Sequence, residues 1–222
     1  MDTPSKRQKL INFRLILLFL VFWTPLIVFF KLAGEIIEEE PIESDIAVLN
    51  WLHGHASPLL DQVLLAFTNI GGVIGMTIIM TVLVASLVYK RQFRNATLLF
   101  AGVGGTTAAN IILKGLFHRS RPSLFSTQVV ETSFSFPSGH AMASAAFTLC
   151  LVLMTWNTKW RWPVVLLGAL YTLAVGISRP YFGVHYPSDI LAGWCASVAW
   201  VVLVFYVINR FGNRSGQKEA ER

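Results

Sequence analysis

The chain has 222 residues, of which 54% are hydrophobic and only 14% are charged. Soluble domains carry about 25% charged residues, so much of this surface faces something other than water. The net charge of +6 is compatible with nucleic-acid binding, but the basic residues are spread between apolar segments, which membrane orientation explains better. The two cysteines, Cys150 and Cys195, are too few for a disulfide framework and lack zinc-site spacing, so both are interpreted as small core residues.

Six apolar stretches each approach the roughly 20 residues that cross the hydrocarbon core of a bilayer. They cover residues 15–34, 72–89, 96–113, 141–156, 162–177 and 190–208. The sequence therefore predicts one all-α membrane domain, residues 1–222, with a six-span bundle at 15–210 and cytoplasmic tails at 1–14 and 211–222. The first stretch follows four basic residues, as in a signal peptide, but its length and the lack of a small-residue cleavage site favour an uncleaved anchor.

Two segments between the first and second spans differ in character. Residues 35–45 hold six acidic residues and no basic one, whereas residues 57–70 place apolar side chains at helical spacing. The second segment is too short to span, which predicts a helix in the membrane interface or packed over the bundle. Within the third span, Gly102, Gly104 and Gly105 predict close approach of helix backbones.

The distribution of Lys and Arg predicts the orientation of the chain. Thirteen of the eighteen lie near the two chain ends and in the loops 90–94 and 159–161, which six spans bring to one side. By the positive-inside rule this side is cytoplasmic, so both termini face the cytoplasm of a cell (inner) membrane. Four of the other basic residues and all five histidines fall on the outer side, which indicates an outward-facing site for an anionic substrate.

Three sequence clusters stand at the outer ends of the third to sixth predicted spans. The first is KGLFHRSRP at 114–122, the second is PSGH at 137–140, and the third is SRPYFGVHYPSD at 178–189. They reduce to the spacings KxxxxxxRP, PSGH and SRxxxxxHxxxD. A single cluster would be a weak signal, but three in this order at one membrane face form a specific pattern.

The residue types in these clusters suit phosphoryl transfer. A phosphoryl group in transfer spreads negative charge over three oxygens, so catalysis consists largely of positioning and electrostatic stabilisation. Lys114, Arg121 and Arg179 are candidates for a phosphate clamp, because guanidinium groups match phosphate oxygens in pairs and lysine supplies a point charge. Ser138 and Gly139 open the fourth span, where backbone N–H groups and the helix dipole favour an anion.

The two histidines of the clusters are candidates for attack on phosphorus and for protonation of the leaving group. Asp189 follows His185 by four residues and can hold one imidazole nitrogen while the other stays free, which favours His185 as nucleophile and leaves His140 as acid. The residues alone do not settle which histidine has which role. The remaining polar side chains near the clusters match no motif position and are interpreted as bystanders: His53, His55, His118, Arg119 and Glu131.

On these three clusters the chain resembles the type-2 phosphatidic acid phosphatase family, membrane lipid phosphate phosphatases that share a fold with vanadium-dependent haloperoxidases. Every motif position is matched. The resemblance implies a phosphohistidine intermediate on His185, proton donation by His140 and orientation of His185 by Asp189. It implies phosphate binding by Lys114, Arg121, Ser138, Gly139 and Arg179. Bacterial members of the family, which this compact chain resembles, suggest phosphatidylglycerophosphate, undecaprenyl diphosphate or phosphatidic acid as substrates.

Several other functions use similar residues. Few acidic residues lie near the histidines and three cations would repel a divalent ion, so we expect no metal and no cofactor, and a lipid phosphate as the only partner. A vanadate-dependent peroxidase is disfavoured by the predicted spans, because the related haloperoxidases are soluble. A lipid or anion transporter without hydrolysis remains an alternative, as does a transferase that moves phosphate between lipids.

Overall fold

The computed structural model describes residues 6–38, 43–125, 129 and 131–220, and the side chains of 19–211 within these ranges. The ends of the predicted tails (1–5 and 221–222) and part of the acidic segment (39–42) lie outside the described residues. All regular structure in the described part is helical. The helices are α1 (Lys6–Ile37), α2 (Glu43–Gly54), α3 (Pro58–Gly71), α4 (Val73–Tyr89), α5 (Phe93–Leu99), the π-helix η1 (Phe100–Gly104), α6 (Gly105–Phe117), α7 (Gly139–Thr155), α8 (Arg161–Tyr181) and α9 (Pro187–Ala220).

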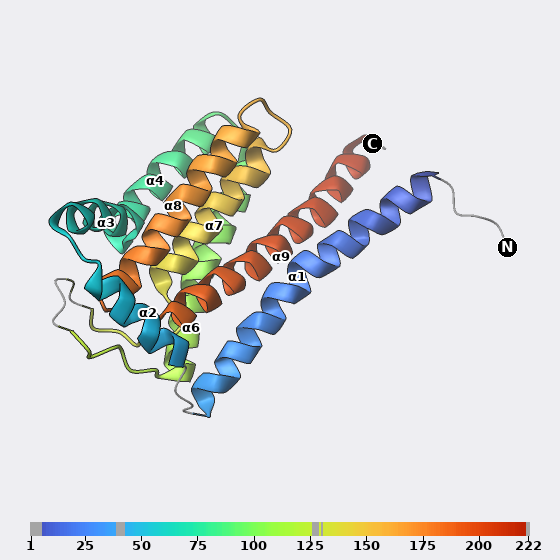
Figure 1. Cartoon of the computed structure of the whole chain (residues 1–222). Helices are drawn as coiled ribbons and strands as arrows, with labels where there is room; N and C mark the ends of the chain where they lie inside the picture. Colours follow the sequence, from blue (N-terminus) through green and yellow to red (C-terminus); the bar gives the residue numbers. More distant parts are fainter. Residues whose placement is uncertain (1–5, 39–42, 126–128, 130, 221–222) are drawn as a thin grey trace.

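The long helices run along a common direction. Helix α1 lies beside α9 at one edge of the bundle, and α7 contacts both α8 and α9 (Figure 1). Helix α2 and the loop 118–138 occupy one end of the bundle. The α7–α8 loop, the start of α1 and the end of α9 lie at the opposite end (Figure 1). The bundle therefore separates the loops that carry the three motif clusters from most of the basic residues.

The expectation of an all-helical membrane bundle is confirmed. Among the described residues, four stretches are long and apolar enough to cross a bilayer: 19–37, 93–117, 161–181 and 187–211. Helices α3 and α4, bent by 52° at their junction, make a fifth if they count as one span. Helix α7 is apolar but has only 17 residues, about 26 Å at 1.5 Å per residue and short of the roughly 30 Å core. Six spans therefore remain a prediction.

The outer surface of the bundle is apolar. On α8, the side chains of Leu166, Leu167 and Leu170 are 63%, 67% and 63% exposed. Contiguous exposed apolar surface of this kind is unfavourable in water, whereas the hydrocarbon core of a bilayer accommodates it. The chain is a multi-pass membrane protein.

Two segments between the first and second predicted spans are helical. The predicted interfacial helix at 57–70 is α3, whose N-cap Ser57 accepts a 3.4 Å hydrogen bond from the backbone N–H of Leu60. Helix α2 was not predicted, because its twelve residues mix apolar and polar side chains and it follows an acidic stretch. Asp45 in its first turn is buried, so α2 is fixed by a polar contact more than by an apolar face.

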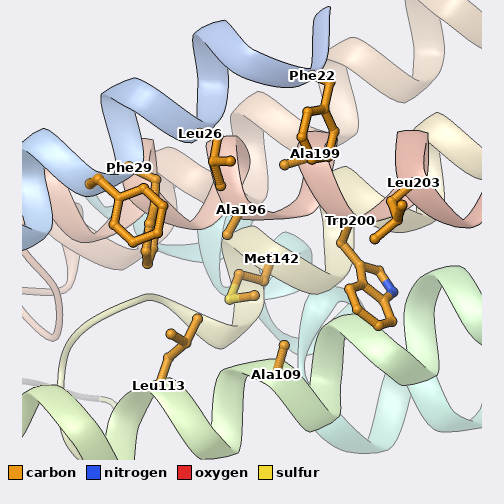
Figure 2. Close-up of a pocket in the computed structure, with 11 residues that line it drawn as sticks. Phe22, Leu26, Phe29, Ala109, Leu113, Met142, Ala196, Ala199, Trp200 and Leu203 are labelled. Atoms are coloured by element: carbon orange, nitrogen blue, oxygen red, sulfur yellow. The ribbon is translucent and has the colours of Figure 1, made fainter. Parts of the chain in front are cut away.

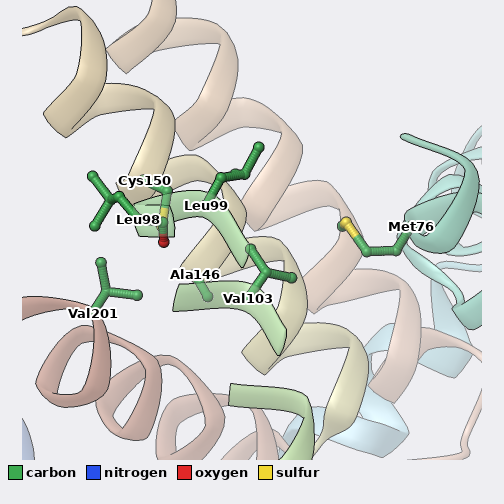
Figure 3. Packing of buried hydrophobic residues seen from close by; sticks show 7 residues of the cluster. All are labelled: Met76, Leu98, Leu99, Val103, Ala146, Cys150 and Val201. Atoms are coloured by element: carbon green, nitrogen blue, oxygen red, sulfur yellow. The ribbon is translucent and has the colours of Figure 1, made fainter. Parts of the chain in front are cut away.

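The main apolar core lies where η1 and α5 meet α7 and α9 (Figure 3). Cys150 of α7 is completely buried there beside Leu99 and Val201, as expected for a core cysteine, and both cysteines are free. Gly102 of η1 permits this contact, because a Cβ at that position would lie 2.5 Å from the Cys150 sulfur. The close helix packing that the sequence predicted at Gly102 is therefore confirmed.

Gly102→Ala tests this packing. The added methyl group has no space beside Cys150, so we expect a loss of about 1–3 kcal/mol of stability, typical of an overfilled core. Gly104→Ala is the matched control, since a Cβ there meets nothing within 4 Å. Thermal unfolding of both variants in the same detergent measures the difference. Equal stability of the two variants would contradict the packing described here.

Candidate active site

A cavity of about 910 Å³ lies at the end of the bundle that carries α2 and the loop 118–138. Five of the predicted site residues line it: Lys114, Arg121, Gly139, His140 and His185. The other three are buried and reach the cavity only through their neighbours: Ser138, Arg179 and Asp189. The structure thus brings the three motif clusters together around one space.

The second cluster forms the start of α7. Ser138 is the N-cap, and its hydroxyl accepts a 3.5 Å hydrogen bond from the N–H of Ala141. The Ser138 N–H donates to the backbone oxygen of Asp189 at 3.1 Å, which joins the starts of α7 and α9. A Cβ on Gly139 would approach the Asn110 side-chain oxygen to 2.9 Å. Close approach of helix α6 therefore requires glycine at this position.

His185 lies in the short loop between α8 and α9 with both ring nitrogens in contact with charged groups. Its Nδ1 is 3.2 Å from the Asp189 Oδ2 atom, and its Nε2 is 3.1 Å from the Arg121 Nη1 atom. A guanidinium group only donates hydrogen bonds. Nε2 is therefore the accepting nitrogen, and the imidazole proton sits on Nδ1, where it bonds to the carboxylate.

The surroundings of His185 keep the imidazole neutral. Complete burial lowers the pKa of His185 to about 4, and the nearby Arg121 and Arg179 act in the same direction, while Asp189 opposes them. Because this pKa lies well below neutral pH, the ring is uncharged there and Nε2 is unprotonated, with its lone pair directed at Arg121. These are the properties that a nitrogen nucleophile needs.

The loop after α6 fixes two of the predicted clamp residues. Lys114 Nζ donates to the Ser133 hydroxyl at 2.9 Å and to the Phe134 carbonyl at 2.6 Å. Arg121 Nε donates to the Ser133 carbonyl at 2.7 Å, and its Nη1 donates to the Val184 carbonyl at the same distance. Burial lowers the pKa of Arg121. Arg121 Nη2 also donates to the Ser133 hydroxyl at 3.2 Å and to the Phe134 carbonyl at 3.4 Å, so two shared acceptors hold the cations side by side.

The third clamp residue, Arg179, is only 1% exposed. Its guanidinium group donates to Thr68 Oγ1 at 2.5 Å and forms an ion pair with Glu131. Glu131 also lies 3.6 Å from Arg121 Nη2, so one carboxylate bridges two of the three predicted clamp cations. Arg179 Nε has no hydrogen-bond partner among the described residues. A buried donor of this kind is suited to a bound anion.

Sequence reasoning missed several residues that contact the motif side chains. Arg119 forms an ion pair with Asp189, Ser135 donates to the same carboxylate, and Glu131 pairs with Arg179. Interpretation of Arg119 and Glu131 as bystanders is therefore not supported by their contacts. The position of Arg119 two residues before Arg121, inside the first cluster, was the available signal. No sequence signal pointed to Ser135.

The other histidines lie away from His185. His53 stacks on Phe125 with ring centroids 3.8 Å apart, and His55 Nδ1 bonds to the Trp51 carbonyl at 2.8 Å. His118 ends α6 in a left-handed conformation with φ of 48°. Within the described part of the chain, the imidazole rings of these three residues contact no motif side chain.

A second cavity, of about 210 Å³, lies between α1, α6, α7 and α9 (Figure 2). Its walls are apolar side chains, including Phe29 of α1, Leu113 of α6 and Trp200 of α9. No charged side chain lines it. It is therefore separate in chemistry from the cavity that holds the motif clusters.

Comparison with known proteins identifies the class. The sequence model of the PAP2 superfamily matches residues 95–213, which contain all three motif clusters. The chain belongs to the PAP2 superfamily.

Among curated proteins, the chain is similar to phosphatidylglycerophosphatase B of Bacillus subtilis, with 28% identity over 71% of this chain and 77% of that one. It is also similar to undecaprenyl-diphosphatase BcrC of Bacillus subtilis, with 26% identity over 73% of this chain and 81% of that one.

Two solved structures are similar to the whole fold. The crystal structure of a transmembrane PAP2-type phosphatidylglycerolphosphate phosphatase from Bacillus subtilis aligns with a TM-score of 0.75 and 25% identity, covering 88% of this chain and 97% of that one. The structure of Aquifex aeolicus LpxE aligns with a TM-score of 0.62 at 21% identity, over 75% of this chain and 98% of that one, and supports the fold alone.

Proposed function

We propose that this chain is a membrane lipid phosphatase that hydrolyses a phosphomonoester or diphosphate of a lipid through a phosphohistidine intermediate. One observation carries the proposal: the cavity joins a buried, neutral His185 and its Asp189 partner to cations from separate segments of the chain. A neutral imidazole beside positive groups suits attack on a phosphate, because the cations reduce its negative charge.

The contacts suggest a two-step reaction. Arg121 turns from the unprotonated Nε2 of His185 to the phosphate oxygens, and Nε2 attacks phosphorus. The bond from phosphorus to the lipid oxygen breaks, and His140 donates a proton to that oxygen. Water then attacks the phosphohistidine, His140 accepts a proton from it, and the N–P bond breaks to release inorganic phosphate. Asp189 holds the Nδ1 proton throughout and stabilises the charge on the imidazole. Lys114, Arg121 and Arg179, with the Ser138 hydroxyl and the Gly139 N–H, bind the phosphate oxygens.

The shape of the cavity favours a lipid over a soluble phosphoester. Its polar wall continues into apolar and small side chains of the membrane helices α4, α6 and α7, including Met76, Ile111 and Ala143. A headgroup phosphate can therefore lie at the cations while the acyl chains stay among apolar residues. The names of the similar bacterial proteins suggest phosphatidylglycerophosphate and undecaprenyl diphosphate as the first substrates to test.

We propose further that the reaction needs no metal ion. The described residues hold no group of three or more His, Cys, Asp or Glu side chains arranged for a metal. The charge that a metal would supply is available from Lys114, Arg121 and Arg179.

His185→Ala tests the nucleophile. Without Nε2 no covalent intermediate forms, so we expect phosphate release from phosphatidylglycerophosphate or undecaprenyl diphosphate to fall by about 10³-fold or more. The measurement is phosphate release by purified protein in detergent, with the elution profile on gel filtration checking the fold. His55→Ala, at an exposed position directly after the end of α2, is the control and is expected to keep full activity.

Retention of wild-type turnover by His185→Ala would falsify the proposed mechanism. In the same assay, His140→Ala is expected to keep much more of its activity on an activated aryl phosphate than on a lipid phosphate, because an activated leaving group does not need a proton. An equal loss on both substrates would argue against His140 as the acid.

Chelation tests metal independence. Because the clamp consists of side-chain cations, we expect EDTA in excess to leave the rate unchanged and added Mg²⁺ to give no increase. The rate is measured before and after dialysis against the chelator. Loss of activity on chelation, followed by recovery with Mg²⁺, would disprove the proposal.

Single cysteines test the proposed orientation, with both termini in the cytoplasm and the site outside. In a background without Cys150 and Cys195, Ser123→Cys lies in the loop at the site and Asn157→Cys in the loop at the opposite end. We expect a membrane-impermeant maleimide to label Ser123→Cys in intact cells (spheroplasts if the cells have an outer membrane) and Asn157→Cys only after lysis. The reverse pattern would put the site in the cytoplasm.

A further inference from the structure

Arg119 lies between two buried carboxylates. Its Nη1 atom is 2.5 Å from Asp189 Oδ1, and its Nη2 atom is 3.0 Å from Asp45 Oδ2. Asp45 comes from α2 and Asp189 from the first turn of α9, so the guanidinium group connects two helices as well as two charges. The side chains of both acids are nearly or completely inaccessible, at 3% and 0% exposure.

Asp45 also holds the start of α9. Its Oδ1 accepts the backbone N–H of Ser188 at 2.8 Å, and its Oδ2 accepts the Ser188 hydroxyl at 2.5 Å. The same hydroxyl accepts a hydrogen bond from Arg119 Nη1 at 2.8 Å. Asp45, Arg119 and Ser188 therefore form a closed hydrogen-bond network, which contacts Asp189 through Arg119.

Three of the five N–H donors of Arg119 are used within this network. Besides its three polar contacts, the guanidinium group stacks on the ring of Tyr186 at 4.0 Å from the centroid. Its side chain is 15% exposed toward the cavity, but Nη1 and Nη2 face the carboxylates. This geometry separates Arg119 from the three clamp cations and directs its charge to Asp189.

The two oxygens of Asp189 have different partners as a result. Arg119 takes Oδ1, while Oδ2 accepts from His185 Nδ1, from the Ser135 hydroxyl and from the Tyr186 N–H. With Oδ1 held, the carboxylate cannot turn, and Oδ2 stays directed at the imidazole. Asp45 balances the excess charge that Arg119 would otherwise place on Asp189 alone.

From these contacts we infer that Asp45 and Arg119 are positioning residues that act through Asp189 to orient His185 for attack. The inference rests on the proposed function, because it assumes that His185 is the nucleophile. It assigns a catalytic task to α2, a helix that contributes no motif residue. Neither residue touches the phosphate.

Two conservative variants test the inference: Asp45→Asn, which keeps the shape of the side chain, and Arg119→Lys, which keeps the charge. We expect kcat to fall about tenfold or more in each, the order of effect seen for partners that orient metal-binding histidines. KM for the lipid and inhibition by inorganic phosphate stay close to wild type, because the clamp is intact. Glu43→Gln, an exposed carboxylate two residues earlier on α2, is the matched control and keeps full activity.

Binding of orthovanadate distinguishes a positioning role from a purely structural one, because only the first affects vanadate affinity and not phosphate affinity. Vanadate accepts a fifth ligand from the nucleophile and mimics the transition state, whereas phosphate stays four-coordinate. Misorientation of His185 therefore weakens vanadate binding in parallel with kcat and leaves phosphate binding unchanged. Calorimetric titration of the folded variants with each anion measures both without turnover.

A double-mutant cycle separates action through Asp189 from an independent effect. Asp45→Asn is combined with Asp189→Asn, and vanadate affinity is measured for both single variants and the double variant. If Asp45 acts through Asp189, its substitution causes no further loss in the Asp189→Asn background. Full additivity overturns the inference.

Three other results also overturn it: wild-type kcat in both variants, a parallel loss of phosphate affinity in Arg119→Lys, or a loss of kcat that only matches the loss of folded protein. The second result would make Arg119 a phosphate ligand. Failure of the proposed function is distinguishable, because it appears as retained activity in His185→Ala. An inactive His185→Ala with a fully active Asp45→Asn rejects the positioning network alone.

Discussion

A carboxylate without exposed surface needs hydrogen-bond donors that compensate its buried charge, and this requirement organises the active end of the bundle. Asp189 meets it through Arg119, Ser135, His185 and the backbone N–H of Tyr186. Each unsatisfied contact would leave a buried charge at a cost of about 1–3 kcal/mol or more. The loop after α6, the α8–α9 loop and the first turn of α9 are therefore fixed relative to one another by a single side chain.

Burial also affects the charge of the other side chains at the cavity. Burial lowers the pKa of His185, and Arg121 and Arg179 act in the same direction, while Glu131 partly neutralises these two cations. The cavity thus holds both signs of charge at a place where helices end and apolar walls begin. Electrostatic interactions in such a setting are stronger than in water, because few solvent dipoles screen them.

The sequence predicted the elements whose signal is local. Apolar length located the membrane helices, and the spacing at 57–70 predicted α3, because both depend on neighbouring residues only. The three clusters supplied five of the residues that line the cavity, whereas the contacts of Arg119 and Glu131 were missed. The number of spans did not follow, since α7 is shorter than the bilayer core and α3 bends into α4.

The contacts that the sequence did not predict are long-range and polar. Asp45 meets Arg119 across 74 positions, and Thr68 meets Arg179 across 111. The periodicity of the sequence does not predict such a pair, because the pair forms only when helices far apart in the sequence pack against each other. Ser133 and Phe134 of the α6–α7 loop are a further example, because their positions are fixed by hydrogen bonds from Lys114 and Arg121.

The π-helix η1 has a consequence for the faces of the helix that contains it. A π-turn holds one residue more than an α-turn, so everything after it is rotated by about 100° relative to an uninterrupted α-helix. Asn110 and Lys114 follow η1 and both line the cavity. One helical wheel cannot describe residues 93–117, because the halves before and after the extra residue have different phases. Insertion or deletion of a single residue in this segment changes which way Lys114 faces, whereas substitution of one apolar residue for another leaves its direction intact.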